Sequence, residues 1–175
     1  MKKIGIGLLV LFCFGLVSCF SREPVDQAAA EEYVKNLTEE EIVKKNSSSK
    51  FSYSKSTIGN KVKLSVKRFN GVEETYVVKT NSAGKKIKVS SNVQQGAIRI
   101  VLCDSKKIVH EFEIGKDETF EIPSSSEKMI LKTAGKDAAY SIVIEWESGI
   151  NLENESPKDF QIVPKRKNDF ETFSI

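Results

Sequence analysis

The sequence predicts a mainly β protein, an antiparallel β-sandwich or jelly roll of about 8–9 strands preceded by a short helical tether. Two observations carry this prediction. From residue 50 onward, short stretches alternate between apolar and polar residues, which is the period of a strand with one buried face. Glycine, asparagine, aspartate and proline separate these stretches at roughly ten-residue intervals. A barrel is the main alternative, because the same pattern also builds barrels.

The composition fits one globular domain with extensions. The chain has 175 residues, and its 39% hydrophobic and 29% charged residues are ordinary values for a globular protein. The formal net charge is +3, and removing residues 1–18 takes away two lysines and no acidic residue. The remainder is therefore nearly neutral, and no nucleic-acid partner is expected.

The N-terminus has the layout of a signal peptide, predicted to cover residues 1–18. Lys2 and Lys3 precede an apolar run over residues 4–17. As a helix, this run would extend about 21 Å, which is short of a hydrocarbon core of ~30 Å. A basic start, a short apolar centre and a small residue before the cleavage site are typical of signal peptides. A short uncleaved signal anchor is the alternative.

The apolar run ends in Leu16-Val17-Ser18-Cys19, which resembles the lipobox of bacterial lipoproteins. The resemblance implies cleavage before Cys19, a diacylglyceryl thioether on its sulfur and a further acyl chain, such as palmitate, on its amine. Two or three acyl chains anchor a protein stably, whereas one gives only marginal binding. The resemblance also implies attachment to the extracytoplasmic side of a bacterial cell membrane or outer membrane. Cys13 lies inside the run and would be removed with it.

Residues 19–49 are predicted to form a lipid-anchored tether that contains a helix. Pro24 suits a first helical turn, and residues 26–45 are rich in good helix formers, with acidic residues near the start and lysines at the end. Thr38 and Glu41 have the spacing of a capping box, which would divide the stretch into two short helices. Apolar residues are sparse, so we favour a spacer helix near the membrane over a docking or coiled-coil helix.

Residues 50–148 are predicted to form the β domain. The clearest strand is 61–67, where three aliphatic residues alternate with lysines and a serine. Residues 97–103 are apolar on both faces apart from Arg99, which is typical of a central strand. A polar break is expected at 46–49. The other strands are expected near 51–53, 75–79, 86–89, 108–114, 119–122, 128–133 and 139–147, with turns at 70–71, 82–84, 95–96, 104–105, 115–117, 123–126 and 135–137.

The stretch from Phe69 to Trp146 resembles small β-sandwich modules that occur as accessory domains in bacterial secreted proteins. The similarity rests on a glycine followed by a long apolar strand at 96–102, a hairpin, a Thr-Phe-Glu-Ile strand at 119–122 and a closing strand that begins at Tyr140. The resemblance implies a sandwich fold and a module that binds polysaccharide or assists folding.

Residues 149–175 are predicted to form a partly ordered C-terminal tail. The tail is polar and of mixed charge, with prolines at 157 and 164 and a basic cluster at 165–167. Its apolar residues would pin it to the domain, and one edge strand is expected near 160–163. A tail that binds a partner is the alternative.

The residues do not predict a catalytic centre. His110 is the only histidine, and its predicted strand places it on a face with three apolar residues, so a packed histidine at the core edge is favoured over a general base. The Gly-x-Ser-x-Gly elbow of a serine nucleophile is absent. Cys103 is the only cysteine after Cys19, so the mature domain has no internal disulfide. Its apolar strand favours an inert thiol over a couple with His110, because burial raises a thiol's pKa.

No metal ion or cofactor is predicted either. The sequence has no Cys/His cluster with zinc spacing and no Asp-x-Asp-x-Asp loop. Asp104, Asp117 and Asp137 fall at predicted turns, where aspartate caps the backbone, although separate loops could still assemble a calcium site. Trp146 shares a predicted face with Tyr140 and two isoleucines, which favours a core position over a platform for a sugar ring.

Lysines provide the candidate contact for an anionic surface. Lys61, Lys63 and Lys67 fall on one outward face, and Lys86 and Lys88 fall on the outward face of a nearby strand. If the two strands are neighbours, these lysines form a basic patch that could rest on an anionic membrane or wall, at ~1 kcal/mol per residue. Ordinary lysine decoration, which keeps sheets soluble and edges unpaired, is the favoured alternative.

These observations predict a non-enzymatic, lipid-anchored cell-envelope protein whose β-sandwich binds or assembles with an envelope polysaccharide or protein. The alternative is a loop-built enzyme or enzyme inhibitor that acts at the envelope. A deep polar pocket containing His110 and a carboxylate would favour this alternative. A structural role in envelope assembly would be accompanied by an exposed apolar patch or an unpaired strand edge.

Overall fold

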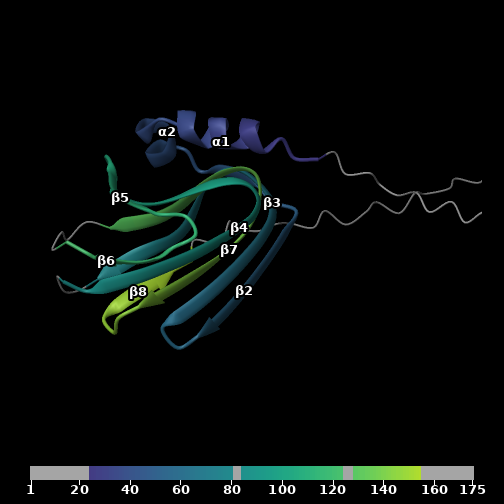
Figure 1. The fold of residues 1–175 in the computed structure, drawn as a ribbon. Helices are drawn as coiled ribbons and strands as arrows, with labels where there is room; N and C mark the ends of the chain where they lie inside the picture. The colour runs from purple at the N-terminus through teal and green to yellow at the C-terminus, as the bar shows by residue number, and fades with distance from the viewer. Residues whose placement is uncertain (1–23, 81–83, 124–127, 155–175) are drawn as a thin grey trace, which may run out of the picture.

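The computed structural model describes residues 24–80, 84–123 and 128–154. Its eight strands form one antiparallel sheet, which two short helices precede, so the predicted mainly β, sandwich-like fold class is confirmed (Figure 1). The elements in chain order are α1 (Gln27–Asn36), α2 (Glu39–Lys44), β1 (Ser47–Ser49), β2 (Ser52–Ile58), β3 (Lys61–Thr80), β4 (Lys86–Cys103), β5 (Ile108–Phe112), β6 (Asp117–Glu121), β7 (Met129–Trp146) and β8 (Ile150–Glu153).

The sandwich arises because three long central strands bend at the same level. In the hydrogen-bonded order β3-β7-β4, Gly135 lies opposite both Gly71 and Ile98 at the bend. The covered half contains residues 72–80, 97–103 and 129–134 together with β1, β5 and β8. The open half contains residues 61–67, 86–93 and 139–146 together with β2 and β6. The two halves face each other across the core, so one bent sheet supplies both layers.

Three predicted turns are wrong, because the chain bends there and does not reverse. Residues 70–71, 95–96 and 135–137 lie inside β3, β4 and β7, which are 20, 18 and 18 residues long. Register shifts mark bulges at each bend, and Arg68, Gly71, Gly96 and Asp137 have positive φ angles there. Turn-forming residues supply the same left-handed backbone to a bulge as to a turn, so the local sequence does not separate the two.

The predicted polar break at 46–49 instead contains a short strand. Ser47 of β1 pairs with Val72, and Ser48 pairs with Gly71. This close approach depends on glycine, because a Cβ at Gly71 would clash with the backbone oxygen of Ser47. At the other end of the domain, β8 extends the sheet beyond the predicted boundary at residue 148 by pairing with residues 77–80 of β3.

The main core lies between the inner faces of the two halves. The alternation predicted for residues 61–67 is confirmed, because Val62, Leu64 and Val66 are buried in this core. Trp146 packs against the same core at its margin, as predicted. The other large side chains buried here include Phe69, Ile87, Ile100, Leu102, Leu131, Tyr140, Ile142 and Ile144.

Side-chain caps start both helices, and the cap of α2 was predicted from the sequence. The Asp26 carboxylate accepts a hydrogen bond from the backbone N–H of Ala29 at 3.0 Å, which caps α1. The capping box of α2 is confirmed. The N–H of Glu41 donates to Thr38 Oγ1 at 3.2 Å, and the N–H of Thr38 donates to Glu41 Oε2 at 3.0 Å. Hydrogen bonds from Lys45 and Thr38 lower the pKa of Glu41 to about 2.

The helices pack on the outer face of the covered half, so the favoured interpretation of a spacer helix is wrong (Figure 1). Leu37 and Ile42 are buried against Val72, Val101 and Ala134, and a second contact joins Ala30 and Val34 of α1 to Ala97 of β4. Few apolar residues are enough to dock these helices on the sheet, because each helix is short. None of the helices in the described part of the chain is long and apolar enough to cross a membrane.

Two cations from the sheet hold the C-terminal ends of these helices. Arg99 donates to the carbonyl of Leu37 at 3.0 Å and makes a bidentate pair with Glu111 at 2.7 and 2.8 Å. Lys132, which is only 1% exposed, donates from Nζ to the carbonyls of Val43 at 2.7 Å and Lys45 at 3.0 Å. Cations are favourable at helix C-termini, where carbonyls lack partners in the helix. Neither role was predicted from the sequence.

Candidate functional site

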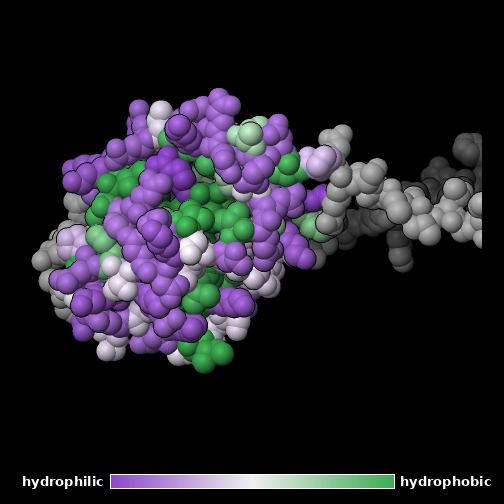
Figure 2. Space-filling model, viewed as in Figure 1, coloured by the Kyte–Doolittle hydropathy of each residue, from purple (hydrophilic) through white to green (hydrophobic). Residues whose placement is uncertain are grey.

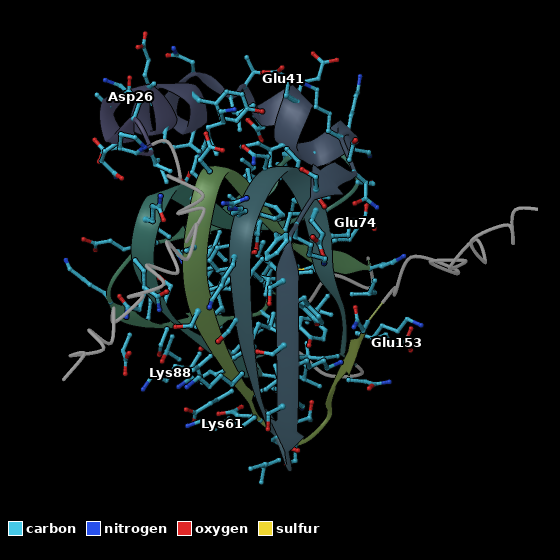
Figure 3. The ribbon with its side chains drawn as sticks, turned by 90° about the vertical axis from the view of Figure 1, so that its right-hand side faces the viewer. Asp26, Glu41, Lys61, Glu74, Lys88 and Glu153 are labelled. Carbon is cyan, nitrogen blue, oxygen red and sulfur yellow. The ribbon has the colours of Figure 1, made fainter. Side chains whose placement is uncertain are left out.

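All five predicted lysines lie on the outer face of the open half. Their neighbours Val62, Leu64, Ile87 and Val89 point into the core, so the lysines between them point outward. The register places Lys61 and Lys88 on either side of Glu145. The two lysine-bearing strands are not direct neighbours, because β7 lies between them, but their lysines share one face of the sheet. Figure 3 shows Lys61 and Lys88 at the end of the domain opposite to Asp26 and the helices.

Carboxylates neutralise much of this lysine face. Lys61 pairs with Glu145 at 2.9 Å, and Lys88 pairs with Asp117 at 2.8 Å. The hydrogen bond between Lys88 and Asp117 raises the pKa of Lys88 and lowers the pKa of Asp117. Glu121 lies opposite the fifth lysine, Lys86. Contact with an anionic surface stays a prediction, and the face is of mixed charge.

A hollow of about 470 Å³ lies between α1 and the bend of β4. Its polar groups are mainly the side chains of Gln27, Glu31, Gln94 and Gln95. The Gln27 amide already donates to the Gly96 carbonyl at 3.1 Å and to Glu31 at 2.8 Å. The rest of the hollow is lined by the apolar side chains of Val34, Val93, Ala97, Ile98 and Ile114. Hydrophobic surface gathers beneath α1 on this side of the molecule (Figure 2). The hollow offers amide, carboxylate and apolar contacts, and no serine, cysteine or histidine lines it.

His110 is a packed residue at the margin of the core, as predicted. Its ring stacks on Phe120 with 4.3 Å between centroids and meets Phe112 edge-on at 4.8 Å. Nε2 lies 2.8 Å from Glu118 Oε1, and the second oxygen of that carboxylate accepts from the N–H of Glu113 at 2.8 Å. These two contacts, led by the backbone bond, lower the pKa of Glu118. His110 lines neither this hollow nor the two others found on the helices.

Cys103 does not form a couple with His110. The register pairs His110 with Leu102, so the next residue along, Cys103, points to the opposite face of the sheet. Its thiol is fully buried and lies 3.4 Å from the carbonyl oxygen of Ile130, to which it donates. Burial raises the pKa of the thiol to about 11. The expected burial of Cys103 is confirmed, and its lack of reactivity stays a prediction.

We expect Cys103 to resist alkylation while the protein is folded. With a pKa of about 11 and no exposure, on the order of one thiol in a thousand would be ionised at pH 8. Iodoacetamide labelling, mapped to Cys103 by mass spectrometry, is expected only after unfolding in urea. Labelling of the folded chain at the rate of the unfolded chain would contradict this expectation.

The same shift predicts a loss of stability at alkaline pH. The neutral thiol is favoured in the folded state, and an unfolded cysteine has a pKa of about 8.5. The contribution of Cys103 is therefore complete below pH 8.5 and is lost as the pH rises through about 11. Urea unfolding of the wild type and of Cys103→Ala, each at pH 7 and pH 10, isolates the pH-dependent contribution of the Cys103 thiol to the free energy of unfolding. The wild type should lose more stability between the two pH values than the variant.

One edge of the open half is unpaired within the described residues. β2 pairs with β3 from Ser52 opposite Lys67 to Ile58 opposite Lys61, and β3 is its one hydrogen-bonded neighbour there. All seven residues of β2 are exposed. Phe51, which precedes the strand, is 72% exposed, and Ile58, its last residue, is 79% exposed. This is the type of edge expected for a structural or assembly role.

The remaining predicted features are placed as follows. Cys19, the signal peptide and the strand expected near 160–163 lie outside the described residues. Asp104 accepts hydrogen bonds from the N–H groups of Lys106 and Lys107 at 2.7 and 2.8 Å, as a turn aspartate does. The described residues contain no group of three or more histidine, cysteine or acidic side chains arranged to hold a metal ion.

No protein-family model, curated protein or solved structure matches this chain.

Proposed function

We propose that this chain is a non-enzymatic lipoprotein of the bacterial cell envelope, anchored through acyl chains on Cys19, whose β-sandwich binds or assembles with an envelope component. The observation that carries the proposal is Leu16-Val17-Ser18-Cys19, a complete lipobox placed directly after a short apolar run with a basic start. The chain lies on the extracytoplasmic side of the cell membrane or outer membrane.

The distribution of cysteines supports this assignment. After cleavage before Cys19, the chain would keep two thiols, at residues 19 and 103. The second is buried in the sheet with a raised pKa, so it is unavailable for modification. Acylation of Cys19 would leave Cys103 without a partner for a disulfide. The domain is stabilised instead by the core of the sandwich and by the docked helices.

The surroundings of the titratable groups support a binding or assembly role over catalysis. Nε2 of His110 contacts Glu118, and two aromatic rings enclose the imidazole. The contact between His110 and Glu118 suits a structural hydrogen bond, because Glu118 holds the ring nitrogen and the two aromatic rings pack against the rest of the imidazole. The enzyme or inhibitor alternative would need a site built by loops at one of the surface hollows, and the hollow beneath α1 is lined by amides, apolar side chains and the single carboxylate of Glu31.

The anchor is tested by comparing two cysteine substitutions in the same segment. Cys19→Ser is expected to abolish incorporation of labelled palmitate and the cleavage of residues 1–18, because serine lacks the soft sulfur nucleophile that the thioether needs. Cys13→Ser is the matched control and should leave both unchanged. Lipid label is the deciding measurement, since an uncleaved apolar run can hold a chain at a membrane by itself. Persistent labelling of Cys19→Ser would overturn the proposal.

The binding role needs a separate experiment. Crosslinking of the anchored protein in its native envelope, followed by purification and mass spectrometry, should recover a specific polysaccharide or protein. The same experiment on a variant with an altered lysine face, Lys63→Glu/Lys67→Glu, tests whether that face binds the partner. If the variant recovers as much partner as the wild type, the lysine face is not the binding surface, and the hollow beneath α1 becomes the candidate.

A further inference from the structure

We propose that the edge of β2 binds an extended segment of a partner protein, which adds a strand to the open half and places an acidic side chain beside Lys55. This carboxylate would pair with the Lys55 ammonium and accept a hydrogen bond from the buried hydroxyl of Tyr76. The inference names the kind of partner for the assembly role proposed above. It rests on that role and not on the lipid anchor.

The edge of β2 is open along its full length. Among the described residues this strand pairs only with β3, and it is the outermost strand on its side of the open half (Figure 1). All seven of its residues are exposed, and Lys55 is the one charged side chain among them. Such an edge leaves a row of backbone N–H and C=O groups for pairing with another chain.

The opposite edge of the open half is built differently. There β6 pairs with β4 and carries three carboxylates in its five residues, those of Asp117, Glu118 and Glu121. Charged side chains on an edge strand discourage pairing with another chain. By contrast, β2 is preceded by the exposed ring of Phe51 and ends in the exposed Ile58. Of these two edges, β2 is therefore the one suited to accept a strand.

The inward face of β2 indicates the chemistry of the partner. Lys55 lies opposite Leu64, whose side chain is buried in the main core, so both point to the same side of the sheet. Lys55 Nζ lies 5.2 Å from the centroid of the Tyr76 ring. Within the described residues Lys55 forms no ion pair, and the buried Tyr76 hydroxyl makes no hydrogen bond of standard geometry. Two donors therefore border this margin of the core without an acceptor.

The state of the Tyr76 hydroxyl fits the role of a donor. Burial, and after it the neighbouring Tyr53, raise the pKa of Tyr76 above its ordinary value. The hydroxyl therefore keeps its proton at neutral pH and can donate to a carboxylate.

A second lysine beside β2 shows what completes such an arrangement. Lys50 Nζ lies 4.5 Å from the centroid of the Tyr53 ring and also pairs with the Glu73 carboxylate at 2.5 Å. Lys55 repeats the contact between an ammonium and a tyrosine ring, with Tyr76 in the place of Tyr53. The missing component is a carboxylate. Its two oxygens allow it to accept from the ammonium and from the hydroxyl at once.

Strand addition would deliver a carboxylate to this position. In an antiparallel pair, side chains directly opposite each other share a face, with their Cβ atoms about 5 Å apart. An acidic residue opposite Lys55 would therefore lie against its ammonium, and residues two positions away would cover Tyr53 and Thr57 on the same face. The β2 strand of a second copy cannot supply the acid, because it contains no aspartate or glutamate. A partner with an extended acidic segment fits this edge.

Peptide selection on the purified full chain tests the proposal. The probe is a displayed library of random seven-residue peptides, and we expect the selected peptides to share an aspartate or a glutamate. Every second amide of β2 points away from β3. A selected peptide should slow hydrogen exchange of these outward amides, measured by NMR, by about tenfold. The same peptide with glutamine or asparagine in place of its acid should bind about tenfold more weakly.

Four variants locate the acceptor of the acidic side chain. Lys55→Gln should weaken binding of the acidic peptide about tenfold, whereas Lys55→Arg keeps the charge and should stay within about threefold of the wild type. Tyr76→Phe removes a hydroxyl that makes no hydrogen bond of standard geometry, so it should fold normally and bind the acidic peptide about threefold more weakly. The matched control is Lys116→Gln, which removes an exposed lysine between β5 and β6 and should bind as the wild type does.

Other results overturn the proposal and identify what the edge does instead. Outward amides of β2 that are already protected in the dilute chain alone mean that the chain covers its own edge. Protection that rises with protein concentration, together with a dimer mass by light scattering, assigns the edge to a second copy. Selected peptides that lack an acid, or that bind Lys55→Gln as well as the wild type, contradict the charge pairing.

Selection of no peptide that protects β2 would exclude this edge as the binding surface. The wider proposal is tested apart from this result, because lipid labelling reports the anchor at Cys19 and crosslinking in the native envelope reports the binding role. An envelope component that crosslinks to another face would keep the binding role and overturn the inference about β2.

Discussion

Replacing Lys132 with methionine is expected to lower the free energy of unfolding by about 3 kcal/mol, because it removes one partner from a buried charged cluster. The ammonium is almost fully buried and donates to two carbonyls at the end of α2, and Glu74 lies 3.4 Å from it. Methionine has a similar volume but leaves the carbonyls of Val43 and Lys45 unpaired and the Glu74 charge without its cation. Urea unfolding followed by circular dichroism measures the loss.

The control for this substitution is Lys44→Met, which removes a lysine of α2 that is exposed and paired with Glu40. Exposed pairs contribute little, so a change below about 0.5 kcal/mol is expected. Adding Glu74→Gln to Lys132→Met should recover part of the loss, because the uncompensated carboxylate is then removed. Equal, small effects of Lys132→Met and Lys44→Met would show that Lys132 does not hold α2 on the sheet.

Gly96→Ala is expected to destabilise the protein by at least about 3 kcal/mol, which combines a conformational and a steric cost. Gly96 has a φ of +66°, which costs an alanine about 1–2 kcal/mol. A Cβ there would also clash with the carbonyl oxygen of Lys136 and lie 2.6 Å from the carbonyl carbon of Asp137. Both are backbone atoms of the neighbouring strand at the bend, so they cannot rotate away. Thermal unfolding or urea titration would report the loss.

Gly59→Ala separates these two costs. Gly59 has nearly the same backbone angle, with φ of +55°, but a Cβ there meets nothing within 4 Å. Only the conformational cost applies, so a loss of about 1–2 kcal/mol is expected. If both variants lose the same amount, the close packing of β4 against β7 at the bend is not what requires glycine.

The strands themselves could be predicted because each has one buried face. In residues 61–67 the alternation of valine and leucine with lysine reports that face directly, and the side chains are buried as the pattern requires. Whether two successive alternating stretches are separate strands or parts of one bent strand could not be predicted in the same way. Asn70-Gly71 and Gly96 provide the backbone freedom that a reversal needs, and the same freedom makes a bulge when the neighbouring strands bend together.

The docking of the helices depends on contacts between residues distant in the chain, which local patterns do not contain. Residues 26–45 alone have too little apolar surface to indicate a core. Their partners are Val101 and Ala134 in the sheet, and the cations that hold them, Arg99 and Lys132, come from different strands. One signal was available: Lys132 interrupts an otherwise apolar strand, and a lysine in such a position needs a buried partner.

The candidate site was predictable to a similar degree. Alternation placed the five lysines outward, and the register brings them onto one face. The carboxylates that neutralise Lys61 and Lys88 come from β7 and β6, so they could be paired only once the strand order was known. The edge of β2 that is unpaired among the described residues is likewise a property of the topology, because the residues of an edge strand and of a central polar strand follow the same alternation.

The docking of α1 also determines how far an anchored domain can stand from its membrane. With α1 fixed to the sheet and capped at Asp26, only residues 20–25 would link Cys19 to the folded body. A fully extended chain covers at most about 3.6 Å per residue, so this leash is on the order of 20 Å. The domain would search a thin layer beside the bilayer, at a high local concentration for whatever else is held there. Molecules deep in a wide compartment would have to come to it.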